Sequence, residues 1–188
     1  MFSHDTEFSL LLVVDLVNTD PVCGGSERLA DADAVQSFVA QHHLSGVNPA
    51  DLSRVKALDA LRRSFRELFG VGDAAAVAAR VNALVAGTSV CPRLSNHDSY
   101  DWHLHYFAPG ASLAEHLAVD GGIAIAHTVT VGQTDRLRIC DAPDCQAVLL
   151  DLSRNRSKRY CEARGCGNRL NVAAYRKRKK TTGAGVAG

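Results

Sequence analysis

Four cysteines near the C-terminal end constrain this chain more than any other feature. Cys140 pairs with Cys145 and Cys161 with Cys166; four residues separate the members of each pair, and fifteen separate the pairs. This spacing is typical of four thiolates that bind one tetrahedral zinc ion. Two disulfides or four unrelated core thiols are the alternatives, and disulfides suit short secreted chains. The chain begins MFSHDTEFSL, without the basic and apolar segments of a secretory signal, so we expect a cytoplasmic location and one structural zinc ion.

Charge divides the chain at about residue 135. Residues 136–188 contain 13 basic and 4 acidic residues, whereas residues 1–135 contain 8 basic and 16 acidic residues. A basic part of this kind indicates a polyanionic partner, most commonly nucleic acid. No apolar run approaches the roughly 20 residues of a membrane span, so we expect no membrane partner. The sequence therefore predicts an acidic domain at 1–134, a zinc module at 135–181 and a flexible tail at 182–188.

The acidic part is expected to be an α+β domain of four helices and a few strands. The near-continuous apolar run 8–17 favours a buried strand, with a short buried helix as the alternative. Capping residues predict helices that begin at Asp31, at Asn48 with Pro49, at Asp73 and at Ser112. The helix that begins at Asn48 would bury an apolar stripe, and Arg62 would lie outside this stripe.

A hairpin is expected between residues 91 and 107. Alternation in YDWHLHYF places His103 and His105 on the same face of its second strand. Two imidazoles on one face suit metal binding or general base chemistry. A half-exposed strand face is the favoured explanation, because no third ligand or acid lies at a recognisable spacing. Asn18, at the end of the first apolar run, is either a pocket residue or a turn residue. The candidate ligand-binding residues are Asn18, Arg62, His103 and His105.

The zinc module is predicted to contain a strand at 136–140, a hairpin that pairs 147–151 with 158–161, and a helix from Cys166 to Lys180. Four cysteines close the zinc shell, so the ion has no open position for a catalytic water. We therefore expect a structural zinc ion and no enzymatic activity in this module. The helix would place residues 170 and 172–174 against the hairpin or a neighbour.

Basic side chains gather on the loop and the helix of this module, where almost no acids interleave. A solvated charged helix is the alternative, but such helices usually alternate both signs of charge. The pattern indicates a surface that tracks phosphates. The residues expected to bind nucleic acid are Arg154, Arg156, Lys158, Arg159, Asn168, Arg169, Tyr175, Arg176, Lys177, Arg178 and Lys180.

The run DLSRNRSKRYC at 151–161, followed by Cys166-Gly167-Asn168-Arg169, resembles the CGNR zinc-finger family. In that family the finger follows an ABATE domain, and the pair is described as a candidate stress-induced transcriptional regulator. Weaker similarity to ABATE rests on LVNT at 16–19, on the Leu-Arg pair at 61–62, and on the strand at 102 ahead of the helix at 112. The chain departs from the pattern at Tyr160, where Trp is common, and at Asn171, where Lys is common. The resemblance implies DNA binding by a treble-clef finger and ligand sensing by the first domain.

Together these features predict a zinc-dependent DNA-binding transcriptional regulator that is not an enzyme, and whose acidic domain senses a small-molecule effector or mediates assembly. A small module buries only about 600–1,000 Å² on DNA, so we expect a homodimer to bind double-stranded DNA. RNA binding by the zinc module is the first alternative. An enzyme that uses His103 and His105 in the first domain is the second.

Overall fold

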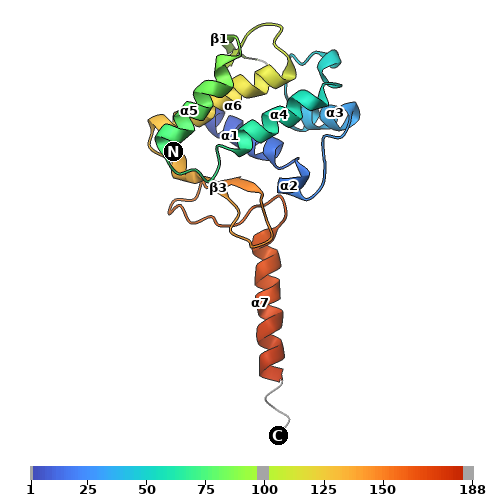
Figure 1. Cartoon of the computed structure of the whole chain (residues 1–188), viewed down its shortest axis with the longest axis vertical. Coiled ribbons are helices and arrows are strands. Elements are labelled where there is room, and N and C mark those ends of the chain that lie inside the picture. Colours follow the sequence, from blue (N-terminus) through green and yellow to red (C-terminus); the bar gives the residue numbers. More distant parts are fainter. Residues whose placement is uncertain (1, 97–101, 184–188) are drawn as a thin grey trace.

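The computed structural model describes residues 2–96 and 102–183, and Figure 1 shows a helical body from which one long C-terminal helix projects. Residues 184–188 of the expected tail lie outside this range. The mixture of helices with two small antiparallel sheets confirms the predicted α+β class. None of the described helices is long and apolar enough to cross a membrane. The elements in chain order are α1 (His4–Val17), α2 (Pro21–Gly24), α3 (Ala32–Gln41), η1 (Pro49–Asp51), α4 (Val55–Arg66), α5 (Ala74–Ala86), β1 (Val90–Ser95), β2 (His103–Phe107), α6 (Leu113–Thr130), η2 (Thr134–Arg136), β3 (Leu137–Ile139), β4 (Val148–Leu150) and α7 (Cys166–Gly183).

Helix α1 occupies the centre of the larger core, and the strand predicted for residues 8–17 is wrong. Ser3 begins the helix as its N-cap, because its hydroxyl accepts a hydrogen bond from the Thr6 backbone N–H. Helices α4 and α6 and strand β4 pack against α1, which explains why its apolar residues are nearly continuous instead of restricted to one stripe. The fourteen-residue length is also greater than that of a typical strand.

The predicted helix starts at Asp31, Asp73 and Ser112 are confirmed. Each side chain accepts a backbone N–H of the first turn, and Ser112 forms a capping box with Glu115. The start at Asn48 is only partly right. Asn48 caps a single 3-10 turn, η1, and α4 begins later, at Val55.

Two glycines in the middle of α6 allow close helix packing. A Cβ atom at Gly121 would lie 2.5 Å from Val13 Cγ2 and 2.8 Å from Phe65 Cζ, and a Cβ atom at Gly122 would lie 2.8 Å from Val85 Cγ1. Helices α1, α4 and α5 therefore approach α6 more closely than an alanine would permit. This contact accounts for residues that are otherwise unfavourable inside a helix.

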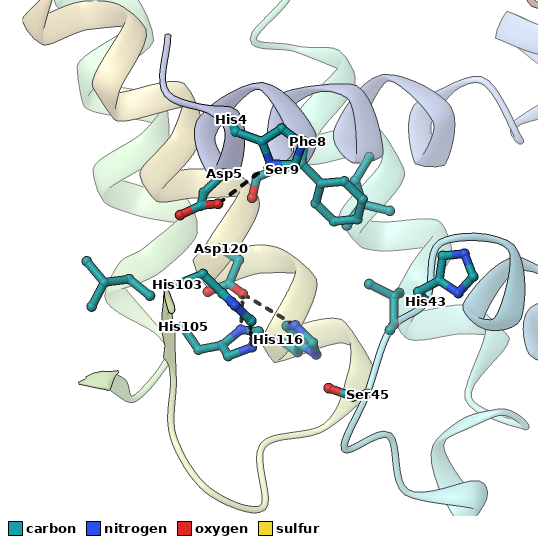
Figure 2. A pocket seen from close by; sticks show the side chains of 13 residues that line it. His4, Asp5, Phe8, Ser9, His43, Ser45, His103, His105, His116 and Asp120 are labelled. Atoms are coloured by element: carbon teal, nitrogen blue, oxygen red, sulfur yellow. Dashed lines mark hydrogen bonds and ion pairs between the residues drawn. The ribbon is translucent and has the colours of Figure 1, made fainter. Parts of the chain in front are cut away.

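The predicted hairpin is present as β1 and β2, which pair antiparallel with His105 opposite Arg93. Strand β2 packs on α6. As predicted, His103 and His105 lie on the same face of β2, and Figure 2 shows both side chains beside α6.

Strand β4 pairs with β3, so the predicted pairing of 147–151 with 158–161 is wrong. Residues 158–161 form no strand; the Asp141 N–H donates to the Arg159 carbonyl at 2.9 Å in an isolated contact. The β3–β4 sheet contributes to two cores. Leu137, Val148 and Leu150 join the large core around α1, whereas Ala147 and Leu149 pack with the four cysteines.

Candidate metal centre and charged surface

The four predicted cysteines converge on one buried site. Cys140, Cys145, Cys161 and Cys166 are each at most 5% exposed, and their sulfurs lie within 4.8 Å of one another. Cys161 Sγ is 3.7 Å from Cys145 Sγ and 3.6 Å from Cys166 Sγ. Zinc–sulfur bonds of about 2.3 Å at tetrahedral angles place sulfurs about 3.8 Å apart. The arrangement therefore fits one structural zinc ion.

Separate pieces of backbone position these ligands. Cys140 follows β3 and donates its N–H to the Ala147 carbonyl at 2.9 Å. The Cys145 N–H donates to the Ala142 carbonyl at 3.1 Å and so closes a turn. The Cys161 N–H donates to Cys140 Sγ at 3.3 Å, and Cys166 is the first residue of α7. The positive end of the α7 dipole therefore faces the anionic cluster.

Burial raises the pKa of the Cys161 thiol to about 12, with smaller contributions from the neighbouring cysteines. A bound zinc ion would displace this proton, because only the thiolate coordinates the metal. Four sulfurs fill a tetrahedral shell, which matches a structural role rather than a catalytic one.

An ion pair outside the metal shell ties α7 to the first cysteine turn. Arg169 binds both carboxylate oxygens of Asp144, one of them at 2.7 Å, and also donates to Cys166 Sγ at 3.4 Å. The hydrogen bonds from Arg169 lower the pKa of the exposed Asp144 carboxyl to about 2. Arg169, predicted to bind nucleic acid, is thus already engaged beside the zinc site. Sequence inspection missed Asp144 because its partner lies 25 residues away.

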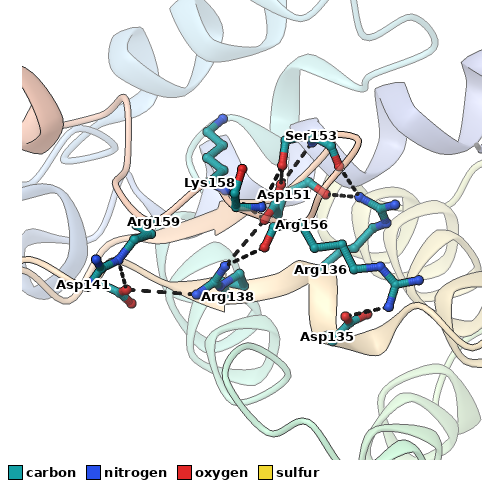
Figure 3. Close-up of polar contacts among 10 residues, drawn as sticks. Asp135, Arg136, Arg138, Asp141, Asp151, Ser153, Arg156, Lys158 and Arg159 are labelled. Atoms are coloured by element: carbon teal, nitrogen blue, oxygen red, sulfur yellow. Dashed lines mark hydrogen bonds and ion pairs between the residues drawn. The ribbon is translucent and has the colours of Figure 1, made fainter.

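The basic loop after β4 is organised around the buried carboxylate of Asp151 (Figure 3). One oxygen accepts the Ser153 N–H at 2.9 Å, and the other accepts the Lys158 N–H at 2.9 Å and Arg138 Nη1 at 3.4 Å. Arg136 donates to the Asp151 carbonyl at 2.6 Å. These contacts fix the ends of a loop whose tip is exposed. Asp151 is a supporting residue that the sequence did not identify.

Ion pairs with nearby acids engage several of the loop cations. Arg156 pairs with Asp135 at 2.7 Å, and Arg159 pairs with Asp141 at 2.8 Å. Lys158 pairs with Glu162 at 2.9 Å. Arg154 is exposed on the same loop. The acids reduce the net charge of the loop, so α7 carries the denser positive charge.

Helix α7 projects from the zinc site away from the helical body (Figure 1). Asn168, Tyr175 and the basic residues 176–179 are exposed on it, whereas the side chain of Lys180 lies outside the part that can be described. Residues 172–174 are exposed and do not pack on the hairpin, and packing against a neighbour, the other expectation, stays a prediction. Leu170 alone of the predicted apolar set packs against the cysteine cluster.

Comparison with protein families agrees with this division into a helical body and a finger. The CGNR zinc-finger model matches residues 136–179. A second model, ABATE, described as "Putative stress-induced transcription regulator", matches residues 11–127, more than half of the chain. The chain belongs to the ABATE family. No curated protein matches it. This ABATE protein therefore combines the family domain with a CGNR zinc finger that provides a site for one structural zinc ion.

Two of the residues predicted to bind a ligand in the ABATE domain are buried in internal contacts. Asn18 exchanges two hydrogen bonds of 2.9 Å with the backbone N–H and carbonyl of Val148. Arg62 is only 2% exposed, so its expected place outside the buried stripe is wrong. Its guanidinium donates to both carboxylate oxygens of Glu27 at 2.9 Å and also pairs with Asp59.

His103 and His105 line a pocket of the ABATE domain together with His116 and Asp120 of α6 (Figure 2). His103 Nε2 lies 3.1 Å from His105 Nε2. His105 Nδ1 and His116 Nε2 lie 3.2 Å and 3.3 Å from Asp120 Oδ2. His116 and Asp120 were not among the residues predicted to bind a ligand, although their spacing of four residues on a predicted helix placed them on one face.

Proposed function

We propose that this ABATE protein is a cytoplasmic transcriptional regulator, without enzymatic activity, that binds double-stranded DNA through its CGNR finger. The observation that carries the proposal is the exposed α7 helix, which begins at zinc ligand Cys166 and presents consecutive basic residues from Arg176 onward. A cationic helix held at one end by a metal site suits contact with phosphates. The regulator description of the matched family supports the same function.

The finger is inferred to be of the treble-clef type, because a cysteine turn, a short sheet and a helix N-terminus supply the ligands. Residues 135–181 would form the DNA-binding part and residues 1–134 the part that responds to an effector. One small finger buries little DNA surface, so we infer that two copies bind a site together. Sedimentation of the protein with and without duplex would measure this stoichiometry.

Fluorescence anisotropy with a duplex at several salt concentrations tests the proposal. We expect affinity to fall steeply with salt, with a slope of about −0.9 for each phosphate contact. The double variant Arg176→Ala/Lys177→Ala should bind more weakly. Its salt dependence should be less steep by the equivalent of up to about two phosphate contacts. Lys56→Ala, an exposed cation of α4, is the matched control and should leave both unchanged.

Three results would overturn DNA binding. The first is an affinity that does not vary with salt, and the second is no binding by zinc-loaded protein. The third is preferential displacement of the duplex by single-stranded RNA, which would favour an RNA-binding finger.

A further inference from the structure

Three side chains that can bind a metal ion converge in the pocket of the ABATE domain. His105 comes from β2, whereas His116 and Asp120 lie one turn apart on α6. One atom from each of these three residues lies within 4.8 Å of the other two. Helix α1 contributes His4 and Asp5 to the same pocket (Figure 2).

We propose that His105, His116 and Asp120 bind a divalent transition-metal ion. Asp120 Oδ2 is 3.2 Å from His105 Nδ1 and 3.3 Å from His116 Nε2. Metal bonds of about 2.0–2.2 Å place neighbouring ligand atoms roughly 3.0–3.5 Å apart, so these distances match one shared ion. Two imidazoles and one carboxylate suit ions such as Zn²⁺, Fe²⁺ and Co²⁺, and they leave coordination positions open.

The ligands are held in place before an ion arrives. The side chains of His105, His116 and Asp120 are 12%, 7% and 13% exposed. The Tyr106 N–H donates to Asp120 Oδ1 at 2.9 Å, which leaves Oδ2 directed at the imidazoles. The His116 ring lies on the Phe107 ring with centroids 3.7 Å apart. Such supporting contacts orient the ligands of metal sites.

Asp120 Oδ2 lies between the two imidazoles, 3.2 Å from His105 Nδ1 and 3.3 Å from His116 Nε2. A carboxylate oxygen placed between two imidazoles suits a divalent cation.

His103 is assigned a positioning role. When His105 coordinates through Nδ1, its Nε2 carries the proton and donates to His103 Nε2, 3.1 Å away. A ligating histidine usually donates its second nitrogen to such a partner, and loss of the partner costs about 10- to 100-fold in metal affinity.

The size of the cavity favours an ion over a larger effector. Its volume is about 80 Å³, far below the roughly 300–1,000 Å³ of pockets for drug-sized ligands. The space suits an ion with the waters that complete its coordination shell. Within the proposed regulatory function the metal ion would itself be the effector, and this part of the inference rests on that function.

Metal titration of the full chain, with zinc already in the finger, tests the site. Calorimetry with Zn²⁺ should show one further equivalent, and Co²⁺ should give absorption bands of a nitrogen and oxygen site. Cobalt that replaced zinc in the finger would instead give thiolate charge-transfer bands, so the two sites are distinguishable. His116→Ala and Asp120→Asn should lose the further equivalent, and His103→Ala should weaken it by about 10- to 100-fold.

The matched control is His127→Ala, an exposed histidine on the same helix, which should retain the further equivalent. Wild-type protein that binds zinc only in the finger would overturn the proposal, whatever the variants do. Folded Asp120→Asn protein that still binds the further equivalent would overturn it as well. DNA binding, measured separately with and without that equivalent, can fail while the metal site stands.

Discussion

Asn18→Ala should destabilise the protein strongly, because Asn18 joins α1 to strand β4 of the finger. The Cys140 N–H donates to the Ala147 carbonyl, so the alternating ladder turns the N–H and carbonyl of Val148 away from β3. The Asn18 amide satisfies both groups at 2.9 Å. Asn18 is 2% exposed and Val148 is fully buried, so solvent does not reach these atoms.

Each buried polar group that loses its partner costs about 1–3 kcal/mol, so we expect a loss of about 2–6 kcal/mol in the free energy of unfolding. The lower end applies if a water molecule occupies the vacated space. Urea unfolding followed by far-UV circular dichroism, at saturating zinc, measures the change. Asn82→Ala, an exposed residue of α5, should stay within about 0.5 kcal/mol of wild type. A loss below about 1 kcal/mol for Asn18→Ala would refute the role assigned to this amide.

Two further substitutions test packing and charge. Gly121→Ala should cost about 1–3 kcal/mol of stability despite the higher helix propensity of alanine, because the new Cβ atom would collide with Val13 and Phe65. Gly87→Ala is the control, because a Cβ atom there meets open space and the change should be nearly neutral. Thermal unfolding of both variants measures the difference. Hydrogen bonds from buried Arg62 lower the pKa of the Glu27 carboxyl. The Glu27 carboxylate therefore stabilises the fold fully above its unfolded pKa of about 4.3. This contribution is lost as the pH falls through the lower pKa of the folded state. The stability difference between wild type and Glu27→Gln should therefore be largest near neutral pH and shrink below about pH 4, and equal differences at pH 7 and pH 3 in urea unfolding would contradict this.

The features that local chemistry determines could be predicted from the sequence. The cysteine spacing indicated the zinc ligands, because a short loop of four residues brings the two thiols of each pair close together. The caps at Asp31, Asp73 and Ser112 were predictable, because each side chain bonds its own first turn. The shared face of His103 and His105 followed from strand alternation.

The features that depend on distant partners could not be predicted. The apolar run 8–17 looks like a strand until α4, α6 and β4 are known to cover the helix from several directions. Arg62 was expected outside the core because its partner Glu27 lies 35 residues away. The pairing of β4 with β3 was missed because the ladder is only three residues long. His116 and Asp120 became candidates only when packing placed α6 beside β2.

Removal of zinc should destabilise the whole chain, because the β3–β4 sheet belongs to both cores. Leu137, Val148 and Leu150 lie in the core around α1, and burial of three such side chains contributes about 4.5–9 kcal/mol. The opposite face of this sheet packs on the small cysteine cluster, which depends on zinc for its fold.

Chelation of zinc should therefore lower the urea midpoint of the circular dichroism signal, which the ABATE helices dominate. Cys161→Ser with zinc present should behave like the chelated wild type, whereas Cys91→Ser, at an exposed cysteine, should not. A midpoint that is unchanged by chelation would mean that the finger unfolds alone and that residues 1–134 keep their stability without it. A shifted single transition would mean that α1, through Asn18 and the large core, links the histidine-lined pocket at its N-terminal end to the finger at its C-terminal end.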